Sequence, residues 1–246
     1  MSALSRLTTT ETRLFFREPV LAFFALAFPP ILLAVLGAVP AMREPSDDAG
    51  GLRAIDLYVP ITVAMGLAVF ALNGLPQLFA TYREKGVLRR MRTTPVEPVV
   101  MLGAQLLMAT VLSAATALAV LVLGRLAFGV ALPRHLPAYL VGYLLTALSM
   151  FAIGLLVASL ASNGKSAGAI GTLVFFPLVF FAGLWLPRAG MPEVLRAISD
   201  FTPLGAGVQS LQDATAGHWP QPLHLAVVLG WVVVAGVPAA RYFRWE

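Results

Sequence analysis

An apolar run and a basic stretch stand next to each other at residues 57–95, which read LYVPITVAMGLAVFALNGLPQLFATYREKGVLRRMRTTP. The run 57–80 contains no Asp, Glu, Lys, Arg or His, and it is long enough for a helix to cross a bilayer, which takes about 20 residues. Barrel strands are excluded because they alternate in polarity over about 10 residues. The stretch 82–95 carries five basic residues: Arg83, Lys85, Arg89, Arg90 and Arg92. The sequence therefore predicts a membrane helix followed by a charged loop.

The whole chain has the composition of a membrane protein. Of its 246 residues, 59% are hydrophobic and 12% are charged, whereas about 25% of a soluble domain is charged. Six apolar runs are long enough to span a bilayer, and the prolines inside several of them indicate kinks rather than breaks. The predicted spans are 20–42, 57–80, 99–123, 138–161, 167–187 and 223–240. We therefore expect an all-α polytopic membrane protein with one transmembrane domain, residues 1–246.

Shorter amphipathic segments accompany the spans. Residues 4–17 place arginines and apolar side chains on different helical faces, which predicts an N-terminal interfacial helix. Glu11 and Glu18 in this polar lead argue against a signal peptide. In residues 191–201 apolar side chains recur at helical spacing, and a second short helix is expected around 204–216. These two outer helices would lie between spans five and six.

The distribution of basic residues predicts the orientation. An even number of spans puts both termini on one side. With that side in the cytoplasm, the inner segments carry 11 of the 17 Lys and Arg residues, in agreement with the positive-inside rule. Topology thus explains the pI of 10.1 without a nucleic-acid partner. Only two of the 17 are lysines, which favours a GC-rich bacterial genome, so we expect a multi-pass protein of a bacterial inner (plasma) membrane with both termini cytoplasmic.

The spans hold almost no ionisable side chains, since Asp56 and His224 lie at or near their ends. A charge at the bilayer centre costs about 2.5–3.5 kcal/mol and is kept mainly for function. The sequence therefore argues against a proton-coupled transporter, an intramembrane metallohydrolase and a voltage sensor. With no cysteine, Cys-ligated metals are excluded, and we expect neither metal nor cofactor. Asn73, Gln77 and Gln105 are candidates for lining a path, although hydrogen bonds between helices are the favoured interpretation.

The chain does not contain a nucleotide-binding motif. The nearest pattern is SLASNGKS at 159–166, but a P-loop begins with glycine, which is Ser159 here, and follows a strand rather than a membrane helix. Asn163-Gly164 instead predicts a tight turn between spans four and five. The energy for any transport must come from a separate subunit, so this chain is expected not to be an enzyme.

The basic stretch itself has the pattern of a short helix. Residues Tyr82 to Arg92 contain no proline, and Val87, Leu88 and Met91 form an apolar stripe with charges elsewhere around the wheel. Pro95 then ends the helix. A basic loop alone is a topology anchor. The helical pattern adds a second interpretation, in which this segment docks a cytoplasmic partner.

Three segments in order resemble the ABC-2 type exporter permeases. Residues 83–107, REKGVLRRMRTTPVEPVVMLGAQLL, resemble that family's cytoplasmic loop, and 180–204, FFAGLWLPRAGMPEVLRAISDFTPL, resemble its fifth span and outer segment. Residues 10–20, TETRLFFREPV, are similar to its entry segment. The loop motif of the family falls on Glu84, Gly86, Leu88, Met91, Thr94 and Pro95. Met91 departs from the commoner Leu.

The resemblance implies half of a transport channel, which pairs as a dimer with a second copy or a paralogue and with a separate ATP-binding subunit. The basic loop would be the coupling helix that seats on this ATPase. The candidate coupling residues are Arg83, Glu84, Gly86, Leu88, Arg89, Met91 and Pro95. The expected cargo is a lipophilic drug-like or lipid-linked compound. The alternative is a membrane scaffold or assembly factor that recruits a cytoplasmic protein through the same loop.

Overall fold

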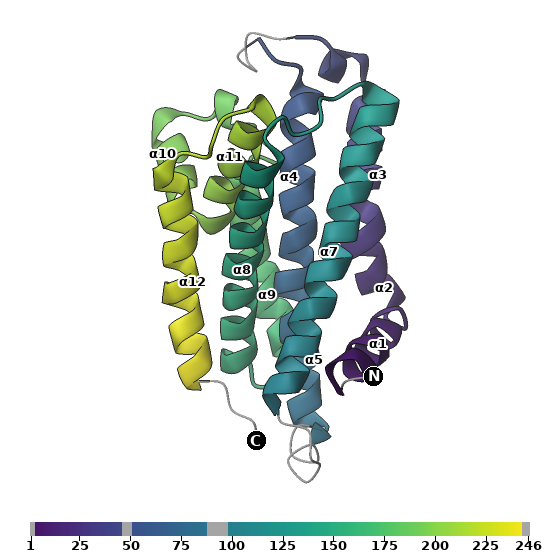
Figure 1. Ribbon diagram of the computed structural model, residues 1–246. Coiled ribbons are helices and arrows are strands. Elements are labelled where there is room, and N and C mark those ends of the chain that lie inside the picture. The colour runs from purple at the N-terminus through teal and green to yellow at the C-terminus, as the bar shows by residue number, and fades with distance from the viewer. Residues whose placement is uncertain (1–2, 46–50, 88–97, 243–246) are drawn as a thin grey trace.

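The protein is a bundle of long helices with short helices packed at its ends (Figure 1). The computed structural model describes residues 3–45, 51–87 and 98–242. Within these ranges the chain forms helices and connecting turns, apart from one isolated bridge between Pro45 and Arg53. In the described part of the chain, six helical segments are long and apolar enough to cross a membrane. The predicted all-α polytopic fold is thus confirmed.

Two of the spans consist of three consecutive helical segments each, and the other four are single continuous helices. The first span joins α2, a π-helical turn η1 and α3, and the second joins α4, a π-helical turn η4 and α5. The remaining spans are α7, α8, α9 and α12. The bounds are α1 Ala3–Phe15, α2 Pro19–Ala22, η1 Phe23–Ala27, α3 Phe28–Ala38, η2 Pro40–Arg43, α4 Ala54–Val69, η4 Phe70–Gly74, α5 Leu75–Glu84, α7 Pro98–Phe128, α8 Leu136–Leu160, α9 Gly164–Phe181, η5 Arg188–Gly190, α10 Glu193–Phe201, α11 Pro203–Ala216 and α12 Pro222–Tyr242.

Every predicted span overlaps one of the observed spans, but the C-terminal ends predicted for two spans lie too far along the chain. The helix of the first span ends at Ala38, not at 42, because Val39 is extended and η2 follows. The fifth span ends at Phe181, not at 187, since Gly183 adopts a left-handed φ of 98°. The second span extends beyond 80 to Glu84. Hydropathy continues past a helix end, whereas backbone geometry sets the end itself.

The second span forms the centre of the bundle. Nearly all side chains of α4 are buried, and it contacts α3, α7, α8, α9 and α11. The π-helical turn η4 brings its carbonyls against two glycines of neighbouring helices. A Cβ on Gly154 of α8 would collide with the Ala71 carbonyl, and one on Gly171 of α9 with the Leu72 carbonyl. Glycine is therefore required at both positions, and spans two, four and five are locked together.

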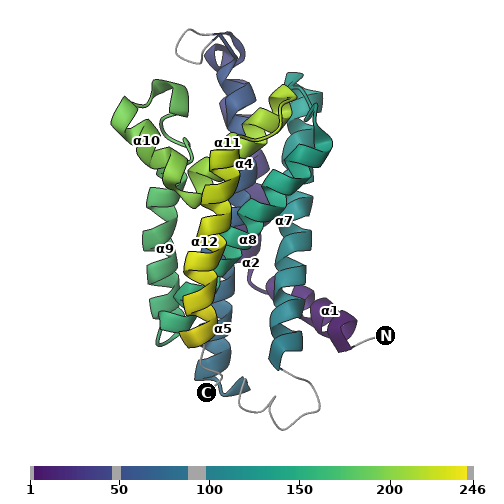
Figure 2. The same cartoon turned by 60° about the vertical axis from the view of Figure 1, so that its left-hand side comes forward.

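The predicted pair of short helices after the fifth span is present as α10 and α11. Figure 2 shows them folded together at the end of the bundle opposite to the termini. Most of α11 is buried, and it packs against α8, α12 and α4. In contrast, α10 exposes Val194, Ile198 and Phe201. An ion pair between Arg188 and Asp200, 2.6 Å long, ties the preceding turn to α10.

The turn between spans four and five has the predicted place. Asn163 caps α9, because its side chain accepts from the backbone N–H of Ser166 at 2.8 Å. The Ser166 hydroxyl in turn accepts from the Asn163 N–H, which completes a capping box. The Gly-Lys-Ser sequence thus forms the first turn of a membrane helix.

Candidate coupling surface

Several segments gather at one end of the bundle, which we call the termini end (Figure 1). It carries α1, the last turn of α5, the first turn of α7, the turn between α8 and α9, and the end of α12. The candidate coupling residues Arg83, Glu84 and Gly86 lie here. Leu88, Arg89, Met91 and Pro95 lie outside the described residues.

Arg83 fastens the end of α5 to the end of α8. Its Nη2 donates to the carbonyl of Ala161, the C-cap of α8, and to that of Ala158 at 3.4 Å. The last carbonyls of a helix carry the negative end of its dipole, so a guanidinium is favourable there. Arg83 therefore forms hydrogen bonds within the chain, in addition to being a candidate coupling residue.

Glu84 makes the matching contact to α9. Its Oε2 accepts from the N–H of Gly164, the first residue of α9, at 3.4 Å. A carboxylate is favourable at the positive end of a helix dipole. The approach is close, because a Cβ on Gly164 would lie 2.8 Å from the Thr81 Oγ1. Adjacent residues of opposite charge thus clamp α5 onto the α8–α9 turn.

Gly86 ends the helix. Lys85 is the C-cap of α5, and Gly86 has a φ of 66°, which favours glycine. The prediction of one helix from Tyr82 to Arg92 is therefore wrong at its start, since Tyr82, Arg83 and Glu84 belong to the second span. The helical spacing of these residues simply continues that of the membrane helix.

A buried acid that the sequence interpretation did not single out joins three helices. Glu11 of α1 is only 6% exposed, and its Oε2 accepts from the Tyr82 hydroxyl at 2.7 Å and from the Gln105 Nε2 of α7. Burial raises the pKa of the Glu11 carboxyl above its ordinary value, against the opposing effect of these two hydrogen bonds. A signal existed, because Glu11 falls at helical spacing from Leu7 and Leu14, on the apolar face of α1.

The three candidate path residues have different environments. Gln105 is fully buried and bonded to Glu11, and the Asn73 Oδ1 accepts from the Thr172 hydroxyl at 3.2 Å. Gln77 is exposed. Hydrogen bonds between helices are therefore present at two of the three positions. Gln77 and Gln105 also line one cavity, whose described lining does not include Asn73.

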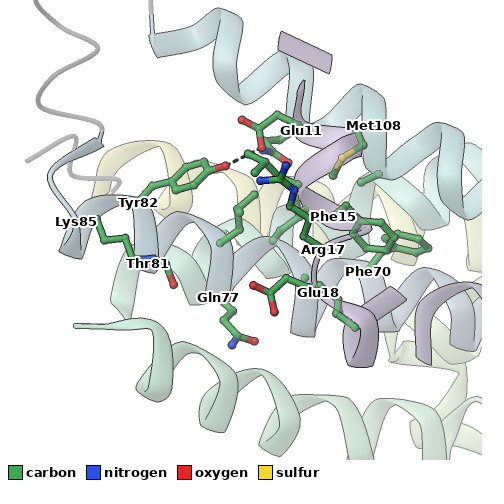
Figure 3. A pocket seen from close by; sticks show the side chains of 17 residues that line it. Glu11, Phe15, Arg17, Glu18, Phe70, Gln77, Thr81, Tyr82, Lys85 and Met108 are labelled. Atoms are coloured by element: carbon green, nitrogen blue, oxygen red, sulfur yellow. Dashed lines mark hydrogen bonds between the residues drawn. The ribbon is translucent and has the colours of Figure 1, made fainter. Parts of the chain in front are cut away.

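This cavity lies beside α1 at the termini end and has a volume of about 330 Å³. Figure 3 shows its lining, with the Tyr82 hydroxyl directed at Glu11 and Phe15 lying next to Phe70. The two rings stack with centroids 5.4 Å apart. Arg17, Glu18 and Lys85 also border the cavity, and all three are exposed.

The comparison with known families gives a clear result. The sequence profile of the ABC-2 type transporter family matches residues 2–215. Two curated relatives carry the name inner membrane transport permease YhhJ, one from Escherichia coli (strain K12) and one from Shigella flexneri. Each is 25% identical over 155 residues, which cover 60% of this chain and 41% of the relative. The match thus spans less than half of each relative's length.

Proposed function

The chain belongs to the ABC-2 type transporter family, and we propose that it is the membrane subunit of an ABC exporter. Members of this family are transport membrane subunits that pair with an ATPase subunit and are not ATPases themselves. The proposed cargo is a lipophilic drug-like or lipid-linked compound, because the spans are apolar. The proposed unit is a dimer of this chain with a second copy or a paralogue.

We further propose that the termini end faces the cytoplasm of a bacterial inner membrane. The support is the excess of basic residues, 11 of 17, in the segments that this orientation puts inside. The name of the two relatives, inner membrane transport permease, agrees with this location. The ATPase would then meet the segment between α5 and α7.

The observation that carries the coupling proposal is the clamp at the end of α5. Arg83 and Glu84 hold this end against α8 and α9 through three hydrogen bonds. Higher up, Gly154 and Gly171 lock the same span to the same two helices. A force applied to the segment after Glu84 would therefore act on spans two, four and five together. In the proposed mechanism, ATP-driven movement of the ATPase shifts these three helices as a unit.

The test replaces the apolar residues proposed to anchor the ATPase. Leu88→Asp combined with Met91→Asp puts two carboxylates where apolar side chains should be buried against the partner, and burying an unpaired charge is strongly unfavourable. Co-purification of the ATPase should fall at least tenfold while the permease still inserts and elutes as one species. The matched control is Leu52→Asp, at an exposed leucine of the opposite end, which should keep the ATPase bound.

The same experiment separates the alternatives. A mere topology anchor would tolerate the double variant, and retention of the ATPase at wild-type level would reject the coupling role. A scaffold that recruits a cytoplasmic protein through this loop would lose its partner, but ATP hydrolysis in its wild-type complex would not respond to any transported compound. An exporter should show hydrolysis stimulated by its cargo in the wild-type complex and not in the double variant.

A further inference from the structure

The cavity beside α1 has the size and the wall of a small-molecule site. Its volume of about 330 Å³ lies within the range of about 300–1,000 Å³ that such sites occupy. Phe15 and Phe70 form a stacked aromatic wall, and Met108 of α7 adds a polarisable surface. An elongated apolar group would find contacts on three helices here.

One buried acceptor among the residues that line this cavity is unused. Gln105 is 0% exposed, and its Oε1 has no hydrogen-bond partner among the described residues. Its Nε2 already donates to Glu11, so the amide cannot turn without losing that bond. Glu11 forms no ion pair with any cation among the described residues, and both of its hydrogen bonds end on Oε2. A buried acceptor without a donor is uncommon and points to an absent partner.

The nearby cations do not supply this partner. Arg17 and Lys85 border the cavity, but both side chains are exposed to solvent. The Tyr82 hydroxyl, a third nearby donor, already bonds to Glu11. The cavity lining therefore offers the Glu11 carboxylate without a cationic partner among the described residues, which selects a ligand that donates hydrogen bonds and carries positive charge.

We propose that this cavity binds lipophilic amines. The ammonium group pairs with the Glu11 carboxylate, while the hydrocarbon body packs against Phe15, Phe70 and Met108. The cavity lies beside the N-terminal helix, at the start of the first span. This inference rests on the proposed function in one respect: it adds a ligand class to the proposed export cargo. Binding of a ligand to the cavity itself requires no ATPase.

The test is a direct binding measurement on the permease alone, in nanodiscs of zwitterionic phospholipid at pH 7. The probe is a dansyl-labelled octyl chain ending in a primary amine, and its control ends in a hydroxyl group. Fluorescence titration, corrected with empty nanodiscs, should show at least tenfold tighter binding of the amine. Glu11→Gln should abolish this preference, because it removes the charge and keeps an acceptor. Glu193→Gln, at an exposed acid of α10, should leave the preference unchanged.

A second measurement covers the case in which Glu11→Gln does not fold. The chain contains no cysteine, so Gln77→Cys places a single thiol at an exposed residue that lines the cavity. The amine probe should slow maleimide labelling of this thiol at least fivefold, and the hydroxyl control should not. The proposal would be overturned by any one of three results. These are equal binding of the two probes to the wild type, a preserved preference in Glu11→Gln, and equal protection of Gln77→Cys by the two probes. A failure here would leave ATPase co-purification unaffected, so the two proposals fail separately.

Discussion

At the scale of single residues, the buried Glu11 lowers the stability of the fold when it is ionised, and it is also the charged group of the proposed ligand site. The carboxyl is buried, and its pKa is raised above the ordinary value of 4.5, so the folded chain binds this proton more tightly than the unfolded chain. The free protein therefore loses stability as the pH rises from about 4.5 through the raised pKa. A cationic ligand would relieve the same unfavourable charge.

This linkage predicts the behaviour of Glu11→Gln without any ligand. At pH 7 the variant should unfold at a higher temperature than the wild type, because the amide accepts from Tyr82 and Gln105 without burying a charge. Below about pH 4.5 the two proteins should unfold at similar temperatures, since the wild-type carboxyl is then neutral. Thermal unfolding in detergent at several pH values measures this difference. A variant less stable than the wild type at pH 7 would show that the ionised carboxylate stabilises the fold.

At the scale of elements, the bundle depends on contacts between a backbone carbonyl and a glycine. Gly154→Ala would drive a methyl group into the Ala71 carbonyl, and backbone cannot move aside as a side chain end can. We expect a loss of about 1–3 kcal/mol, the usual cost of overpacking. The control is Gly230→Ala in α12, where a Cβ meets no atom within 4 Å. That change should instead raise helix stability by about 0.5–1 kcal/mol. Equal effects on the unfolding temperature would contradict the locked arrangement.

The helices themselves could be predicted because hydropathy and length suffice to find a membrane span. Their ends could not, since Val39 and Gly183 end helices through backbone conformation while apolar residues continue. The helical spacing of residues 82–92 also led to the wrong assignment of Tyr82 to a separate loop helix. The second span keeps its 3.6-residue period where it leaves the apolar layer, so spacing alone does not mark where the span ends. Glu11 was missed because an acid in a polar leader is expected to be exposed; its helical spacing from Leu7 and Leu14 was the one sign that it lies on the face of α1 that α7 covers.

At the scale of the whole molecule, the charged side chains of the described residues are segregated to the two ends. The termini end holds the clamp of Arg83 and Glu84 and the cavity with Glu11. The opposite end holds the ion pair of Arg188 with Asp200, which also lies 3.4 Å from the His224 Nε2. The apolar spans between them are consistent with an integral membrane protein whose two ends face different compartments.

This arrangement yields a topology test in a chain without cysteine. Lys165→Cys puts a thiol on the exposed α8–α9 turn of the termini end, and His218→Cys puts one on the exposed segment after α11 at the opposite end. The basic excess of the inner segments predicts that the termini end is cytoplasmic. An impermeant maleimide added to intact spheroplasts should therefore label His218→Cys and leave Lys165→Cys unlabelled. After permeabilisation both should react, which shows that each thiol is accessible. The reverse pattern would place α5 and its clamp outside the cell, where no ATP-binding subunit could reach them, and would exclude the coupling proposal together with the orientation.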